Sequence, residues 1–328
     1  MRPMTLLSNH QTEINSFWPK LLQSKRVLIG THEHPDGDAI GSSLALWHVL
    51  RAHGVEATVY IPDAAPEFFS YMSGFQHLTT HKPDASKYDA LVLLDYTQLY
   101  RTHLEAEFLV HPFSVCIDHH YDNPAQGKYN IVVAQAAATA QILAELFATV
   151  EVSVNAETAT CLLTGIFTDT GSFMHDSTTP EILNIASDLM SKGARLSHIA
   201  HETYQKKELS SLRIWGKALS RILINEKNGA AVSIVTPQDL HECEATLDDL
   251  SGVVNMLNTL PQANFAMVLC EYEPGKIKGS LRSEPNKGID VSLIAKQLGG
   301  GGHKLASGFE VDGHIVRKKG QWRIEPVH

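Results

Sequence analysis

Residues 31–43 read THEHPDGDAIGSS and join one apolar run, residues 26–30, to a second apolar segment, residues 44–50. The short continuous run indicates a buried strand, and the longer apolar segment after the loop indicates a helix. Pro35 and Gly37 favour a sharp bend between them, because proline fixes φ and glycine tolerates positive φ. The stretch is therefore predicted to form a strand, a tight loop and a helix.

Three side chains of this loop have the chemistry of metal ligands. The bend gathers the imidazole of His32 and the carboxylates of Asp36 and Asp38 at one end of the strand. One imidazole with two carboxylates favours a divalent cation. An Asp-rich turn beside a surface histidine would have the same sequence, so the rest of the chain has to distinguish the two interpretations.

Three further apolar runs share the composition of residues 26–30. They are rich in Val, Leu and Ile without polar alternation, and they occupy residues 57–61, 90–94 and 113–117. Short continuous runs separated by helical segments indicate a parallel sheet that is buried on both faces. Helices are predicted around these strands at residues 10–24, 39–53, 65–72 and 97–106.

Polar residues follow the third and fourth runs as well as the first. Asp95 comes directly after residues 90–94, and Asp118-His119-His120 comes directly after residues 113–117. Ligands of an open α/β sheet bind beyond the carboxyl ends of its strands, so these side chains are expected to meet those of the first loop. A helix N-cap would be an alternative role for Asp95.

Asp169 adds a further carboxylate beside a glycine turn at the end of a predicted helix, residues 156–167. The predicted metal ligands are then His32, Asp36, Asp38, Asp95, His119 and Asp169. A single octahedral ion could not use all six and still admit substrate, whereas two ions about 3.5–4 Å apart with one bridging carboxylate could. Four carboxylates and two divalent ions also make the site nearly neutral.

The mixture of oxygen and imidazole ligands favours Mn²⁺ over Mg²⁺ and leaves Mg²⁺ and Co²⁺ as alternatives. Such a centre supports phosphoester hydrolysis, because the metal lowers the pKa of a bound water, which attacks in line, and stabilises the leaving oxygen.

The composition limits the classes of partner. The chain has 328 residues, which predicts two domains of unequal size, and a formal net charge of -9. An acidic chain is a poor partner for long duplex nucleic acid, which requires a basic face. No apolar run approaches the about 20 residues of a membrane span. Four widely separated cysteines are expected to be reduced core residues, which predicts a cytoplasmic protein.

The second half of the chain changes to hairpin patterns. Runs at residues 219–224 and 230–235 flank the turn Asn225–Gly229, and runs at 264–271 and 276–282 flank Glu273–Gly275. Helices are predicted at 180–212, 246–258 and 289–298. We therefore predict an α/β protein: an N-terminal parallel sheet with helices on both faces (1–185), a helical linker (186–212) and a smaller mixed α/β domain (213–328).

The chain resembles the DHH phosphoesterase family. Four separated motifs occur in the family's order: His32-x-x-x-Asp36-x-Asp38, Asp95, Asp118-His119-His120 and Asp169-Thr170-Gly171. Further on, Arg282-Ser283 and the segment GGGGHK-x-A-x-G at 299–308 resemble the family's DHHA1 domain. The resemblance covers nearly the whole chain after residue 25.

The resemblance implies how the metal ligands are shared. His32 and Asp36 would bind one ion, Asp38, His119 and Asp169 the other, and Asp95 would bridge both.

The catalytic and substrate-binding residues are implied in the same way. His120 would serve as general acid or phosphate contact, with Asp118 orienting a histidine. Arg282 would hold phosphate oxygens with its forked guanidinium. Ser283, Gly300, Gly301, Gly302 and His303 would complete the substrate site. Taken alone, the glycine run could also be a helix C-cap followed by a turn.

The resemblance implies a Mn²⁺-dependent phosphoesterase of the nanoRNase and pAp phosphatase branch. Its substrates would be very short RNA or DNA oligonucleotides and 3'-phosphoadenosine 5'-phosphate, and a homodimer stays open. A cyclic-dinucleotide phosphodiesterase is the nearest alternative. A family II pyrophosphatase would lack the glycine-rich histidine motif, and the complete acidic set argues against a non-catalytic nucleotide sensor. His34 stands where the family often carries Asn and has no predicted role.

Overall fold

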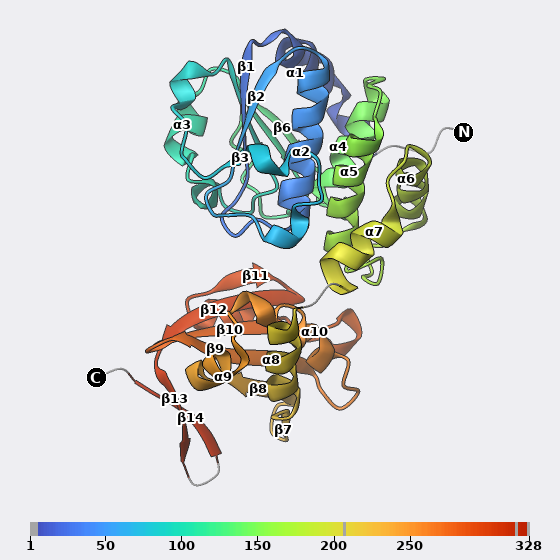
Figure 1. Ribbon diagram of the computed structural model, residues 1–328. Coiled ribbons are helices and arrows are strands. Elements are labelled where there is room, and N and C mark those ends of the chain that lie inside the picture. The colour runs from blue at the N-terminus through green and yellow to red at the C-terminus, as the bar shows by residue number, and fades with distance from the viewer. Residues whose placement is uncertain (1–5, 206–207, 319–320, 327–328) are drawn as a thin grey trace. The chain divides into compact units, whose positions relative to one another are not determined.

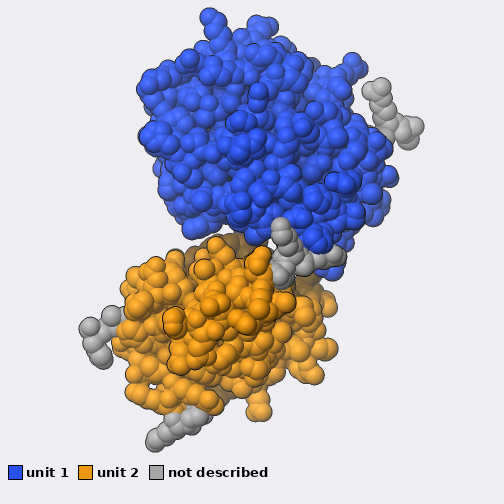
Figure 2. All heavy atoms as spheres, in the orientation of Figure 1, with its two compact units in different colours: residues 1–206 blue, residues 207–328 orange. Residues whose placement is uncertain are grey.

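The computed structural model describes residues 6–205, 208–318 and 321–326. The chain divides into two compact units, residues 1–206 and 207–328 (Figure 2). This division lies inside the predicted linker 186–212, of which residues 206 and 207 lie outside the described residues. The described part of that linker is not free-standing, because Leu189 and Ile199 belong to the core of the first unit.

A six-stranded parallel sheet organises the first unit, with the strand order β3-β2-β1-β4-β5-β6 (Figure 1). Its strands are β1 Arg26–Gly30, β2 Glu56–Tyr60, β3 Leu78–Thr79, β4 Ala90–Leu94, β5 Ser114–Asp118 and β6 Tyr129–Val132. Every neighbouring pair is parallel, which confirms the predicted sheet. The prediction missed β3, which has two residues, and β6, which is only partly buried.

Helices cover both faces of this sheet, as predicted. One face packs against α1 Gln11–Gln23, α2 Gly37–Ala52, α4 Thr139–Thr149, α5 Ala156–Asp169 and α6 Pro180–Ser191, followed by α7 Leu196–Ala200. The other face is covered more thinly, by α3 Glu105–Val110 and the turns before it.

Two predicted helices of the first unit are wrong in extent. The segment 65–72 forms only a 3₁₀ turn, Glu67–Phe69, because Pro66 lacks a backbone donor and Gly74 takes a left-handed conformation nearby. The segment 97–106 is a 3₁₀ turn, Leu99–Thr102, followed by the start of α3.

The second unit is a mixed sheet with the order β11-β12-β10-β9-β8-β7. Its strands are β7 Leu223–Asn225, β8 Ala230–Val235, β9 Phe265–Glu273, β10 Lys276–Arg282, β11 Gly301–His303 and β12 Ala306–Asp312, with a separate hairpin of β13 His314–Lys318 and β14 Gln321–Glu325. Among the described residues of this second unit, only β8 and β9 pair in parallel. Both predicted hairpins, β7–β8 and β9–β10, are confirmed.

The helices of the second unit lie on opposite faces of its sheet. α8 Leu209–Leu219, α9 Pro237–Cys243 and α10 Val253–Asn258 share one core, and α11 Val291–Gln297 packs in another. The prediction missed α9, and it also missed β11, β12, β13 and β14. Across the described ranges, no helix combines the length and the apolarity that crossing a membrane would require.

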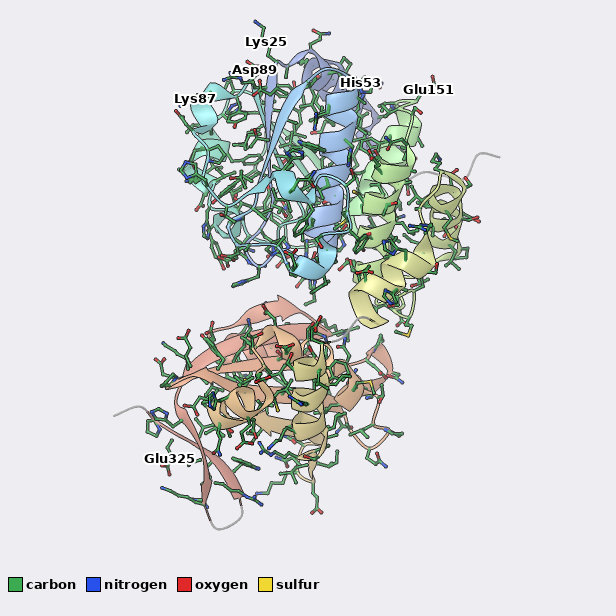
Figure 3. The ribbon with its side chains drawn as sticks, in the orientation of Figure 1. Lys25, His53, Lys87, Asp89, Glu151 and Glu325 are labelled. Atoms are coloured by element: carbon green, nitrogen blue, oxygen red, sulfur yellow. The ribbon has the colours of Figure 1, made fainter. Side chains whose placement is uncertain are left out.

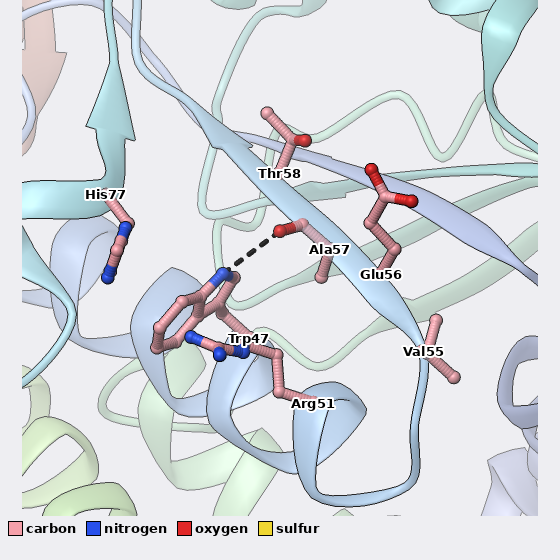
Figure 4. Close-up of a pocket in the computed structure, with 7 residues that line it drawn as sticks. All are labelled: Trp47, Arg51, Val55, Glu56, Ala57, Thr58 and His77. Atoms are coloured by element: carbon pink, nitrogen blue, oxygen red, sulfur yellow. Dashed lines mark hydrogen bonds between the residues drawn. The ribbon is translucent and has the colours of Figure 1, made fainter.

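The amino ends of the strands in the first unit hold none of the predicted site residues. Lys25 and Asp89 lie together there (Figure 3), and the Lys25 backbone N–H donates to Oδ2 of Asp89 at 2.7 Å. A surface pocket of about 380 Å³ lies beside β2, and none of the residues that line it is a predicted site residue (Figure 4). In it, the Trp47 indole N–H donates to the Ala57 carbonyl at 3.0 Å, under the Arg51 guanidinium.

Candidate metal centre

In the loop after β1, hydrogen bonds with the backbone orient two candidate metal ligands, Asp36 and His32. Asp36 is the N-cap of α2, and its Oδ1 accepts from the backbone N–H groups of Asp38 and Ala39 at 3.0 Å. This cap uses one oxygen and leaves Oδ2 for a cation. Nδ1 of His32 lies 2.6 Å from the Glu33 carbonyl. A carbonyl can only accept, so the proton is on Nδ1 and Nε2 presents its lone pair.

Asp38 lies in the first turn of α2 and is 1% exposed. Its two oxygens accept from the backbone N–H groups of Thr139, at 2.6 Å, and Ala140, at 2.9 Å, at the start of α4. A helix N-terminus stabilises a carboxylate. Burial, together with the charges of Asp95 and Asp169, nevertheless raises the pKa of Asp38 well above its ordinary value. A divalent cation would offset this repulsion.

Asp95 follows β4 directly and is held in the left-handed region, with φ of 54°. Such a conformation costs a non-glycine residue about 1–3 kcal/mol, and it aims the buried carboxylate into the cluster. The side chain of Asp95 faces Nε2 of His32 at 3.7 Å, Nε2 of His119 at 3.6 Å and Nδ1 of His120 at 3.7 Å. Burial opposes ionisation, but in the metal-free chain the positive charge of these imidazoles, when they are protonated, outweighs it and holds the pKa of Asp95 well below its usual range.

β5 ends at Asp118, whose fully buried carboxylate is occupied by donors. Oδ1 accepts from the His119 backbone N–H and from Nδ1 of His120, both at 2.8 Å, and Oδ2 accepts from the Asn123 amide at 2.6 Å. Burial opposes the protonated imidazole, but the hydrogen bond to Asp118 and the charge of Asp95 outweigh it and raise the pKa of His120 to about 9. Asp118 therefore orients His120.

His119 and Asp169 lie side by side at the carboxyl edge. Nδ1 of His119 lies 3.3 Å from the Ala136 carbonyl, so Nε2 again carries the lone pair, and it is 3.4 Å from Oδ2 of Asp169. Asp169 is the last residue of α5. Burial and the carboxylates of Asp36 and Asp95 raise the pKa of Asp169 to about 7.

The fold brings all six predicted metal ligands together in overlapping groups. Ligand atoms lie within 4.8 Å of one another in the group His32–Asp36–Asp95 and in the group Asp38–His119–Asp169, and a third group joins Asp95 to Asp118, His119 and His120.

Four carboxylates meet in this cluster, and no lysine or arginine among the described residues forms an ion pair with any of them. Asp38 and Asp95 are buried, Asp169 is partly exposed and Asp36 is exposed, and buried charge of one sign requires a counter-charge. The donor set therefore fits divalent cations.

The predicted substrate residues lie in the second unit. Arg282 ends β10, and its NH1 donates to the Leu281 carbonyl at 2.9 Å. Ser283 is buried, and its backbone N–H donates to the Leu305 carbonyl at 2.9 Å. His303 is exposed at the end of β11, an edge strand.

Part of the glycine run has a structural role, as the helix C-cap alternative expected, and its role in phosphate binding stays a prediction. Gly299, with φ of 77°, lies two residues after the end of α11, and the Gly300 N–H donates to the Ala295 carbonyl at 2.8 Å, which closes the C-terminus of the helix. Gly301 and Gly302 continue into β11. A Cβ on Gly300 would come within 2.1 Å of a backbone oxygen, whereas one on Gly301 would meet nothing within 4 Å. The backbone is thus open to a ligand at Gly301.

Several residues that contact the candidate metal ligands or lie in their loop were not assigned a role from the sequence. The backbone N–H of Thr139 donates to Asp38, and its hydroxyl donates to Asp95. Thr139 lies 101 residues from Asp38, so no local sequence pattern predicts the contact. Asn123 follows the Asp-His-His motif by three residues and could have been recognised as a turn residue. His34 is held at φ of 53°, and its N–H donates to Oδ2 of Asp63 at 2.8 Å while its ring is 74% exposed.

Comparison with known proteins covers both units. Residues 26–166 match the model of the DHH family, N-terminal domain, and residues 218–319 match the DHHA1 domain. A bifunctional oligoribonuclease and PAP phosphatase, NrnA, from Thermus thermophilus is 33% identical over 305 residues, 90% of this chain and 90% of its own. A crystal structure of an exopolyphosphatase-related protein from Bacteroides fragilis matches with a TM-score of 0.86 and 28% identity, over 91% of both chains.

A more distant match is the cyclic-di-AMP phosphodiesterase GdpP from Geobacillus thermodenitrificans. It is 26% identical over 94% of this chain, but the match spans only 48% of that protein.

Proposed function

Since this chain belongs to the DHH family and is a hydrolase of phosphoester bonds, we propose that it degrades very short oligoribonucleotides to mononucleotides and converts PAP to AMP. The observation that carries the proposal is the pair of ligand groups, His32–Asp36–Asp95 and Asp38–His119–Asp169, at the carboxyl edge of the sheet. The substrate class is taken from the NrnA relative, which matches over both units of this chain.

In this proposal His32 and Asp36 hold one ion, Asp38, His119 and Asp169 hold the other, and Asp95 bridges them. Mn²⁺ is the proposed metal, because two imidazoles among carboxylate oxygens suit it better than Mg²⁺. Bound ions would supply an activated water and would stabilise negative charge on the phosphate.

The chain's own residues supply binding and proton transfer. Nδ1 of His120 donates to Asp118, which raises the pKa of the imidazole to about 9, so Nε2 also carries a proton near neutral pH and could donate it to a phosphate or leaving oxygen. Arg282 and the exposed backbone near Gly301 are proposed to hold the rest of the substrate, together with Ser283, Gly300, Gly302 and His303.

A cyclic-dinucleotide phosphodiesterase remains the alternative, and the GdpP match favours it. The shorter coverage of that protein ranks it second. The DHHA1 match weighs against a family II pyrophosphatase, as the glycine-rich motif does.

The proposed setting is the cytoplasm, where the four buried unpaired cysteines would stay reduced. The net charge of -9 supports short substrates rather than long duplexes.

The test is a substrate panel with Mn²⁺ and the full-length protein. The proposal expects phosphate release from PAP and mononucleotide release from a linear diribonucleotide, each with a higher kcat/KM than for cyclic di-AMP. Faster turnover of cyclic di-AMP would favour the alternative. Binding of PAP and the diribonucleotide without turnover would refute the enzyme assignment for these substrates.

A further inference from the structure

Glu33, the residue after His32, makes contacts that involve none of the proposed metal ligands except His32. Its partners lie in the segment that follows β4 and Asp95. The Glu33 backbone N–H donates to the Arg101 carbonyl at 2.8 Å. The Glu33 carboxylate accepts from Nε of Arg101 at 3.4 Å and lies 3.1 Å from Nε2 of His103. Arg101 and His103 thus hold both the backbone and the side chain of Glu33.

The backbone carbonyl of Glu33 connects these contacts to the candidate metal centre. It accepts from Nδ1 of His32 at 2.6 Å and also from NH2 of Arg101 at 3.3 Å. Because Nδ1 is engaged by this carbonyl, Nε2 of His32 faces the cluster, 3.7 Å from Oδ2 of Asp95. A movement of this carbonyl would therefore rotate the imidazole away from the ion.

The segment is bent to make these contacts. His103 is held in the left-handed region with φ of 54°, a conformation that a non-glycine residue adopts only at a cost. A surface ion pair contributes only about 0–1 kcal/mol, so the Arg101–Glu33 pair, with both side chains about 30% exposed, would scarcely offset that cost by itself. The contacts of Arg101 and His103 with Glu33 therefore point to a role other than stability, namely the orientation of the neighbouring His32 imidazole.

We propose that Arg101 and Glu33 form a clamp that positions His32 and so sets the affinity of the ion held by His32, Asp36 and Asp95. This inference rests on the metal assignment proposed above. Residues that orient a metal-binding histidine typically change metal affinity 10- to 100-fold. Loss of the clamp should weaken this ion by about that factor, while the group Asp38–His119–Asp169 keeps its ion.

The experiment compares the full-length wild type with Arg101→Met and Glu33→Gln, using Mn²⁺ alone as the probe. Arg26→Met is the matched control, because it removes an ion pair to Glu56 of 3.3 Å at the opposite end of β1. Titration calorimetry and Mn²⁺ electron paramagnetic resonance give the number and the affinity of the bound ions. Thermal unfolding in EDTA reports the fold separately.

The clamp predicts one weakened ion in Arg101→Met, unchanged unfolding in EDTA, activity restored by excess Mn²⁺, and wild-type binding in Arg26→Met. Glu33→Gln keeps the backbone contacts and should show a smaller loss, which carries the test if Arg101→Met does not fold. Two ions at wild-type affinity in both Arg101→Met and Glu33→Gln would refute the clamp alone. A wild type that binds no Mn²⁺ would refute the proposed metal centre and the clamp with it.

Discussion

Removing the metal ions should make the first unit less stable as the pH rises. In the chain alone, burial and the carboxylates of Asp36 and Asp95 raise the pKa of Asp169 from 3.8 to about 7. Because the folded-state pKa lies above the unfolded one, the folded protein binds more protons between these values. The free energy of unfolding is therefore highest below the unfolded pKa and falls as the pH rises through about 7.

The size of this loss follows from the pKa shift. One pKa unit corresponds to about 1.4 kcal/mol, so the shift of Asp169 corresponds to about 4 kcal/mol. The side chain is 31% exposed, and solvent screening reduces this to about 2–3 kcal/mol. The pKa of Asp38 is raised in the same direction and adds to the loss. Domains are stable by about 5–15 kcal/mol in total, so the effect is measurable.

The assay is urea unfolding of the full-length protein between about pH 5 and pH 7, with EDTA or with Mn²⁺. Stability should fall with pH in EDTA and should not fall with Mn²⁺, because the cations offset the carboxylate charges. Asp169→Asn should flatten the EDTA curve. Asp188→Asn, which removes an exposed carboxylate of α6, should leave it steep. A wild-type stability in EDTA that is constant or rises over this range would refute the reasoning.

Three substitutions test separate parts of the site. Asp95→Ala should abolish turnover and lower the Mn²⁺ content measured by mass spectrometry, since the residue is proposed to serve both ions; undiminished turnover would remove its bridging role. Arg282→Ala should raise KM for a diribonucleotide more than it lowers kcat, and an unchanged KM would show that Arg282 does not hold substrate. Asp118→Ala should lower the pKa of His120 and move the alkaline limb of the pH–rate profile down by about 1–2 units. A limb that stays in place would assign that limb to another group.

The fold was predictable where local pattern alone determines an element. Ala90–Leu94 is continuously apolar and fully buried, as a central parallel strand requires. Leu78–Thr79 is too short to carry any pattern, and the helix predicted at 65–72 fails because a proline interrupts its start. Glycines 299–302 illustrate a different limit, because a helix C-cap and a phosphate loop call for the same residues.

The convergence of the proposed ligands was predictable because each of them lies in a motif next to the end of a strand or a helix. His32, Asp36 and Asp38 lie within seven residues of one another, so their convergence is local. The groups that support them are not local. The N–H groups at the start of α4 reach Asp38 across more than a hundred residues, and Arg101 reaches Glu33 across 68. Only the folded sheet brings such pairs together.

Four of the six proposed ligands share one physical property: backbone groups hold their side chains in place without a metal. Asp36 caps α2 with one oxygen, Asp38 receives two N–H groups of α4, and His32 and His119 are each aligned by a carbonyl. Small metal-dependent folds instead collapse when the ion is lost, because nothing else orders their ligands. Here the geometry is set in advance, so ion loss should leave the fold intact and expose an electrostatic cost. That cost is the mutual repulsion of the clustered carboxylates, which grows as they lose protons, so the stability in EDTA should depend on pH.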